Sequence, residues 1–230
     1  MIRKATFLLL FFIFVENIFM RAYAEEGLSI VEVLPEPSNK FYVFVNKGLY
    51  VVILMPIIAL LFHKYLPDFV AISLGILLVV YILFYFFYVQ LGNLYRSENI
   101  AYQVIGKIHF YNDFLEIMNK RIDFSEFRSI EINSYDYEDR RSASNTLYNP
   151  LYSLGINNFL TVYFKDGTVN KYQFKLLNEI HMFYFRKELV HYYKLGLIRE
   201  LNLHDILGNH SFESKSDFRK HNPKYNNYPS

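Results

Sequence analysis

The chain has 230 residues, of which 53% are hydrophobic and 19% aromatic, with a formal net charge of +2. This apolar content exceeds that of an ordinary soluble domain, so part of the chain is expected to face lipid. The 24 basic residues are scattered rather than gathered on one stripe, which argues against nucleic-acid binding, and the lack of cysteine excludes disulfides and thiolate sites.

Residues 1–24 have the three parts of a secretory signal. Basic residues begin the segment, an apolar stretch covers 5–15, and a small-x-small pattern ends at Ala24, directly before Glu25. Cleavage between Ala24 and Glu25 is therefore predicted. Two alternatives stay open, namely an uncleaved N-terminal anchor and a start of synthesis at Met20.

A two-helix transmembrane hairpin is predicted after a short extramembrane segment at 25–47. The stretch 69–91 carries no charge and would be about 34 Å long as a helix, enough for the hydrocarbon core. Its partner at 48–66 is less regular, because Pro56 removes a backbone donor, which a neighbouring helix can compensate in lipid. Membrane lipid is therefore the expected surrounding of the whole hairpin, 48–91.

The predicted hairpin shows little sign of a transport function. Neither apolar stretch carries an ionisable group in its middle, where ion and proton pathways usually place one. Ala71 and Gly75 form a small-xxx-small face, which is suited to contact with another helix.

Two indications disagree on the side of the membrane that the following domain occupies. A cleaved signal and two crossings place it outside the cytoplasm, in the periplasm for a bacterial inner membrane. The basic residues near the hairpin are Lys40, Lys47, Arg96 and Lys107 on its outer sides and Lys64 in its link. This distribution favours the cytoplasm by the positive-inside rule. We take the signal as the stronger indication.

Residues 102–196 are predicted to form a folded domain. Apolar and polar residues alternate along several segments, and Asn112-Asp113 and Asp166-Gly167 supply turns for two β-hairpins. The spacing then changes to a helical one over 176–194, and Gly196 ends that helix. An amphipathic helix after the last strand can cover the apolar face of an antiparallel sheet.

This order of elements resembles the pleckstrin-homology-like fold, and the chain is similar to small bacterial membrane proteins in which two transmembrane helices precede such a domain. The resemblance covers 49–196 and rests on "GKIHFYNDFLEI", "KRIDFSEFRSIEI" and the strand–Asp-Gly–strand–helix ending. The expected fold class is a membrane-anchored α+β protein with a PH-like antiparallel sheet or barrel capped by a C-terminal helix. The resemblance implies binding or scaffolding rather than catalysis. In this chain the first hairpin loop of the domain holds Asp113 and no Lys or Arg, so it is not expected to bind anionic lipid headgroups.

The long segment 134–158 is the predicted partner-binding site. It combines tyrosine with arginine, which protein interfaces favour, although a solvated loop with balanced charge has the same composition. The candidate contacts are Tyr135, Tyr137, Arg140, Arg141, Tyr148 and Tyr152. The expected occupant is another protein or a second copy of the chain.

The sequence contains no motif that predicts catalysis. The histidines form no metalloprotease pair, and there is neither a Gly-rich phosphate loop nor a Gly-x-Ser-x-Gly elbow. No catalytic residue, metal or cofactor is therefore predicted. Residues 208–230 are polar and without periodicity, which predicts a tail that is disordered or that becomes ordered on a partner.

Two functions compete at this point. The first is a non-catalytic, membrane-anchored scaffold whose domain binds a protein or peptide at the membrane surface. The alternative is a membrane-perturbing or pore-forming effector that acts through oligomerisation of the hairpin. An effector should stop growth when its synthesis is induced, whereas a scaffold should be tolerated.

Overall fold

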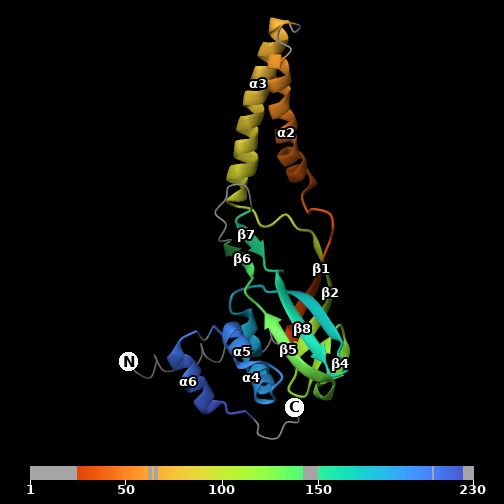
Figure 1. Ribbon diagram of the computed structural model, residues 1–230, viewed down its shortest axis with the longest axis vertical. Helices are drawn as coiled ribbons and strands as arrows, with labels where there is room; N and C mark the ends of the chain where they lie inside the picture. Colours follow the sequence, from red (N-terminus) through yellow and green to blue (C-terminus); the bar gives the residue numbers. More distant parts are fainter. Residues whose placement is uncertain (1–24, 62–63, 65–66, 142–149, 209, 225–230) are drawn as a thin grey trace, which may run out of the picture. The chain divides into compact units, whose positions relative to one another are not determined.

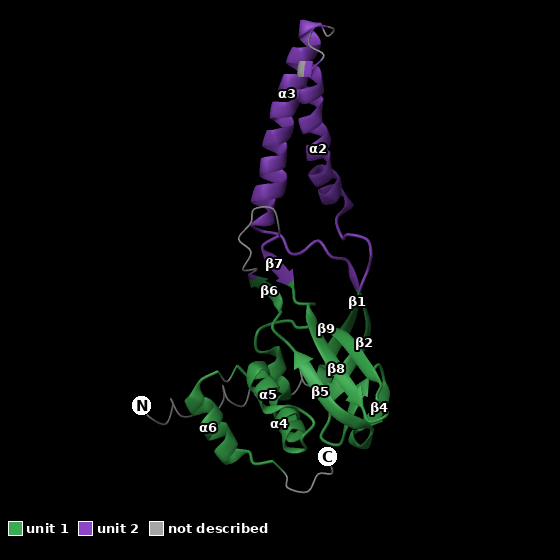
Figure 2. Cartoon of the chain, in the orientation of Figure 1, with its two compact units in different colours: residues 1–32, 103–140, 154–230 green, residues 33–102, 141–153 purple. Residues whose placement is uncertain are grey.

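Figure 1 shows a computed structural model of the protein, which describes residues 25–61, 64, 67–141, 150–208 and 210–224. These residues form two compact units (Figure 2). The sheet unit comprises the residues up to Glu32, Gln103–Arg140 and those from Leu154 onward, and the hairpin unit comprises Val33–Tyr102 and Arg141–Ser153. The predicted signal at 1–24 lies outside the described residues.

A seven-stranded, mostly antiparallel sheet forms the first unit, with strand order β4-β3-β2-β1-β9-β8-β5. Its strands are β1 (Leu28–Val33), β2 (Tyr102–Phe110), β3 (Phe114–Ile117), β4 (Lys120–Asp123), β5 (Phe127–Asn133), β8 (Asn158–Phe164) and β9 (Val169–Lys175). The two edge strands, β4 and β5, are separated by only the short 3-10 turn Phe124–Glu126. Because so few residues span only about 10 Å, the sheet must curl until its two edges come close together.

Both predicted β-hairpin turns are confirmed. Asn112-Asp113 lies between β2 and β3, and Asp166-Gly167 lies between β8 and β9. In the second turn Gly167 has a φ of +90°, which only glycine adopts easily. The Asp166 carboxylate accepts hydrogen bonds from the backbone and hydroxyl of Thr168, and the hydroxyl bond holds the pKa of this carboxyl below its ordinary value.

The predicted helix over 176–194 is only partly continuous. It begins as the 3-10 helix η4 (His181–Phe185) and becomes α-helical in α4 (Arg186–Lys194). Gly196 ends it, with a φ of +79° and with Gly196 and Leu197 donating to the carbonyls of Tyr193 and Tyr192. This is the hydrogen-bond pattern of a Schellman motif.

Tyr192 connects α4 to the sheet. Its ring is fully buried, 4.8 Å from that of Phe124. Its hydroxyl donates to the carbonyls of Tyr111 (2.7 Å) and Phe114 (3.2 Å), at the turn between β2 and β3. Burial raises the pKa of Tyr192 above its ordinary value. The helix therefore covers the sheet as predicted, with a polar contact at the end of its apolar face.

The predicted boundary of the domain was wrong at its N-terminal side. The segment 25–47 is not wholly extramembrane linker, because Leu28–Val33 forms β1, which lies between β2 and β9. Ser29 pairs with Lys175, and the Leu28 and Ile30 side chains are almost completely buried. A domain limited to 102–196 would lack this strand.

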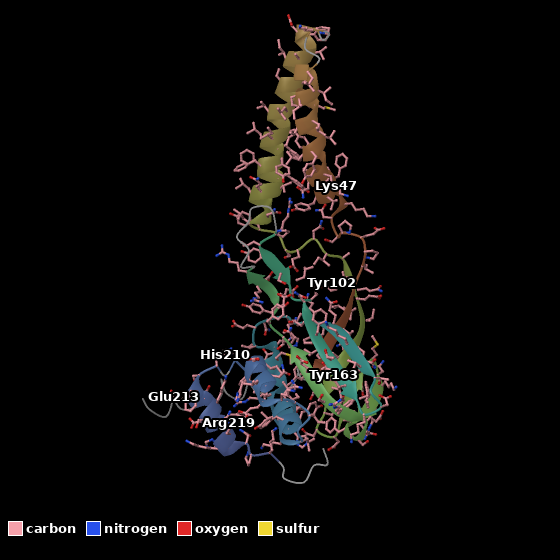
Figure 3. The ribbon with its side chains drawn as sticks, viewed as in Figure 1. Lys47, Tyr102, Tyr163, His210, Glu213 and Arg219 are labelled. Carbon is pink, nitrogen blue, oxygen red and sulfur yellow. The ribbon has the colours of Figure 1, made fainter. Side chains whose placement is uncertain are left out.

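The predicted disordered tail at 208–230 contains a helix, α6 (Phe212–His221), so this prediction was wrong for those residues. Ser211 caps it by accepting a hydrogen bond from the Ser214 amide. Phe218 is buried against Tyr193 and His204, and Arg219, which lies on α6 (Figure 3), pairs with Glu200 of α5 (Glu200–Ile206). A single apolar anchor in a polar helix gives little periodicity, which is why the sequence pattern missed it.

The hairpin unit is built on two apolar helices. They are α2 (Lys40–Leu61) and α3 (Asp68–Tyr85), which continues as the π-helix η2 (Phe86–Leu91). Lys40–Ala59 and Asp68–Leu91 are long and apolar enough to cross a membrane, and most of their side chains are not buried against protein. By length and composition they support membrane insertion. The first helix starts earlier than the predicted boundary at 48.

Close packing between α2 and α3 occurs at Gly48. A Cβ atom there would lie 2.5 Å from the Tyr81 hydroxyl, which donates to the Val45 carbonyl. Gly75, in contrast, has no atom within 4 Å of the position of a Cβ. The predicted small-residue face of Ala71 and Gly75 is therefore not used to pack this hairpin.

Candidate binding cleft

A cleft of about 290 Å³ lies where β5 ends beside α5. Its lining residues come from the sheet unit alone and are Glu131, Ile132, Asn133, Ser134, Tyr135, Asn202, Asp205 and Ile206. Most of them are polar, so the cleft suits a hydrogen-bonding or charged group rather than a purely apolar one.

Tyr135 forms a fixed wall of this cleft. Its side chain is 50% exposed, and its hydroxyl accepts a hydrogen bond from the Asn157 carboxamide at 2.7 Å. The Arg140 guanidinium lies 5.5 Å from the centre of the Tyr135 ring and donates to the Tyr135 carbonyl at 2.5 Å. The Tyr135 side chain is thus fixed at its hydroxyl and at its backbone carbonyl. Less side-chain entropy is therefore lost when a partner binds against the ring.

A buried polar network supports the backbone next to Tyr135. The Asn158 side chain is fully buried, accepts from the Asp136 amide at 2.9 Å and donates to the carbonyls of Asp136 (2.7 Å) and Gly155 (2.9 Å). The Asp136 carboxylate accepts from the Asn157 amide at 3.0 Å. Satisfied networks of this kind make a local structure rigid. This part of 134–158 is therefore ordered structure rather than a solvated loop.

The cleft is lined in part by the end of β5, which is an edge strand of the sheet. The Ile130 amide donates to the Leu197 carbonyl at 2.8 Å. The Ile132 amide donates to the Asn202 carboxamide oxygen at 3.0 Å, and the Asn202 amide group donates back to the Ile132 carbonyl at 2.6 Å. An unpaired strand edge invites association with other strands, and these contacts close it as far as Ile132.

Two carboxylates give the cleft its charge. Glu131 and Asp205 are both exposed. The hydroxyl of Tyr163, which lies on β8 (Figure 3), donates to one Glu131 oxygen at 3.3 Å. No Lys or Arg is among the residues that line the cleft. Its potential is therefore negative at neutral pH.

The structure brings together only some of the predicted contact residues. Tyr135 and Arg140 contact each other beside the cleft. Tyr137 packs against the main core, and Arg141 and Tyr152 belong to the hairpin unit. Tyr148 lies outside the described residues. The predicted loop also contains two short strands, β6 (Glu138–Arg141) and β7 (Tyr152–Leu154), which pair with each other.

Six of the eight lining residues lie outside the predicted segment 134–158, and the polar ones among them are Glu131, Asn133, Asn202 and Asp205. Glu131 lies between Ile130 and Ile132, as a polar residue on the outer face of a strand does, and nothing in this pattern distinguishes it from a solvated side chain. Asn202 and Asp205 follow Gly196, where the last helix was predicted to stop. The spacing of Leu203 and Ile206 is helical and could have indicated α5.

His181 is a buried titrating group of the sheet unit whose pKa is strongly shifted. It is only 3% exposed, and its Nδ1 atom accepts a hydrogen bond from the Leu177 amide at 3.1 Å. Burial lowers the pKa of His181 to about 4, against a smaller opposing effect of Glu26. Within the described ranges no group of three or more His, Asp or Glu residues could hold a metal ion. We therefore interpret His181 as a neutral residue with a structural role.

This burial predicts an acid-sensitive fold. Below pH 6.5 the unfolded chain binds a proton at His181, whereas the folded chain does so only near pH 4. The free energy of unfolding is therefore highest above pH 6.5 and falls as the pH is lowered towards 4. The loss should reach about 3 kcal/mol. Urea unfolding in detergent at pH 7 and pH 4.5 measures it, and His181→Gln should remove much of the difference. The exposed His210 supplies the control, His210→Gln; a pH dependence shared equally by both variants would contradict the assignment.

Comparison with known proteins gives no match. No protein-family model matches the chain, no curated protein matches it, and no solved structure matches it. The geometry of the site is therefore the basis for the function proposed below.

Proposed function

We propose that the chain is a non-catalytic, membrane-anchored binding protein whose sheet unit engages a protein partner at the cleft beside Tyr135. The observation that carries this proposal is the fixed, half-exposed aromatic ring of Tyr135, which lines the cleft at the end of β5. Tyrosine and arginine in such positions supply much of the binding energy of protein interfaces. Arg140 stacks on this ring and extends the rim.

The position of the hairpin in the chain supports the anchoring part of the proposal. Strands β1 and β2 are neighbours in the sheet, and α2 and α3 lie between them in sequence. The membrane segment is therefore an insertion between adjacent strands, and two chain connections tie it to the binding unit. Lipid surrounds the hairpin in this proposal, within a bacterial inner membrane, and the sheet unit lies outside the cytoplasm.

The fold gives the proposal further support. A curled antiparallel sheet of seven strands followed by a helix agrees in element order with a PH-like domain. Such domains serve as binding modules, in keeping with the resemblance described above. The occupant is a separate protein, and a homo-oligomer is the alternative occupant.

Site-specific photo-crosslinking in living cells tests this function. A photoreactive amino acid at Tyr135 should give an adduct with a partner protein, because the side chain lies at the cleft. The same amino acid at Val169, exposed at the opposite end of the β8–β9 pair, should give none. Adducts at Val169 but not at Tyr135, with the protein present in the membrane fraction, would exclude the cleft as the interface.

One observation favours the alternative effector function. The face of α3 with Ala71 and Gly75 is open, since nothing lies within 4 Å of a Cβ atom at Gly75. A second hairpin could pack there closely. If this function holds, induced synthesis should arrest growth, and Gly75→Leu should relieve the arrest. A scaffold should be tolerated at the same level of synthesis.

A further inference from the structure

The hydrogen bonds that cover the outer edge of β5 extend as far as Ile132, and the cleft begins beyond them. The Asn202 carboxamide bonds to both the amide and the carbonyl of Ile132, as the peptide group of a neighbouring strand would. Outward-facing backbone groups alternate along an edge strand. Ile130 and Ile132 are such residues, β5 ends at Asn133, and Ser134 follows the strand directly and lines the cleft. A polypeptide in the cleft can therefore continue this edge at Ser134.

The charged residues around Ser134 indicate which kind of polypeptide the cleft would bind. Glu131 and Asp205 line the cleft, and neither forms an ion pair with any residue that the structure describes. The Tyr135 ring forms the adjacent wall. Carboxylates beside an aromatic face attract a cation, since the charge and the ring quadrupole act in the same direction. The basic side chain that contacts Tyr135, Arg140, is held on the Tyr135 ring and carbonyl.

We infer that the cleft binds an extended segment of the partner protein that carries Arg or Lys. This inference rests on the proposed function and specifies the partner. The basic side chain enters between Glu131 and Asp205 and lies against Tyr135, while the backbone of the segment pairs with Ser134. Arginine is the better occupant, because its planar guanidinium can stack on the ring and bond to a carboxylate at once.

The test uses the full-length protein in detergent micelles and a dye-labelled peptide, acetyl-Ser-Val-Arg-Val-Ser-amide. The matched probe replaces arginine with citrulline, which keeps the shape and loses the charge. Fluorescence anisotropy should show the arginine peptide binding at least about tenfold more tightly. Its affinity should fall as salt is raised, because the carboxylates are exposed. Equal affinity of the two peptides would overturn the inference.

Variants of the protein locate the site. The double substitution Glu131→Gln with Asp205→Asn should weaken binding of the arginine peptide about tenfold and abolish its preference over citrulline. The control is Asp166→Asn, which removes an exposed carboxylate from the β8–β9 turn and leaves binding unchanged. Binding that is insensitive to the double substitution would overturn the assignment.

Two further outcomes separate the parts of the inference. If N-acetylarginine amide competes as well as the peptide, the strand-like pairing at Ser134 is wrong and the cleft recognises a lone cation. If photo-crosslinking at Tyr135 succeeds while both peptides bind equally, the cleft is the interface and the basic chemistry of the partner is wrong. Loss of the crosslink itself would instead overturn the proposed function.

Discussion

A fragment that starts at Ala101 and ends at Lys224 is expected not to fold, although it contains every strand of the sheet except β1. That strand lies between β2 and β9, so its loss removes two ladders from the centre of the sheet. Leu28, Ile30 and Val31 are each at most 3% exposed. Their burial contributes about 2 kcal/mol each, which together approaches the whole stability of a typical domain.

Restoring β1 without the hairpin should restore folding. The Leu34 amide donates to the Ala101 carbonyl at 2.8 Å, so these two residues already face each other as at the end of a β-hairpin. A two-residue Asn-Gly turn in place of 35–100 can close them. The fragment 25–34 joined in this way to 101–224 should give a dispersed amide spectrum in water. A dispersed spectrum from 101–224 alone would show that β1 is dispensable.

Gly155→Ala is expected to destabilise the sheet unit by about 4 kcal/mol or more. Gly155 has a φ of +71°, and a Cβ atom there would collide with the Glu138 amide nitrogen and the Leu176 carbonyl oxygen. Those two atoms form a hydrogen bond of 2.9 Å, and the Leu176 amide donates to the Gly155 carbonyl at 2.8 Å. The methyl group would therefore separate backbone segments that hold the network around Asn158.

Gly167→Ala is the matched control for this substitution. Gly167 also has a positive φ, +90°, but no atom lies within 4 Å of its Cβ position. Gly167→Ala should therefore lower the free energy of unfolding only through backbone strain, by about 1 kcal/mol. Denaturant midpoints of the two variants measure the difference. Similar losses in both would mean that the backbone at Gly155 moves aside without cost.

The strands and turns could be predicted because their signals are local. Alternation of side chains fixes a strand, and Asp166-Gly167 fixes the turn between two strands without reference to distant residues. The place of β1 could not be predicted in this way. Its partner residues are remote, with Ser29 opposite Lys175, and the hairpin separates β1 from β2 in the chain.

The binding cleft could be predicted only in part. Composition indicated Tyr135 and Arg140, because aromatic and basic residues gather in one segment. It could not indicate Glu131 and Asp205, which are ordinary exposed carboxylates until α5 folds against the end of β5. A cleft assembled from segments distant in sequence leaves no local pattern.

The insertion of the hairpin between β1 and β2 also constrains the order of events during synthesis. The ribosome makes β1 before either helix, and its partner β9 only near the end of the chain. An apolar strand that waits without a partner is prone to aggregation. Moreover, a single crossing of the bilayer would leave β1 and β2 on opposite sides of the membrane, where they cannot pair. For the proposed membrane anchor, pairing of β1 with β2 thus requires that the segment between them crosses the bilayer an even number of times.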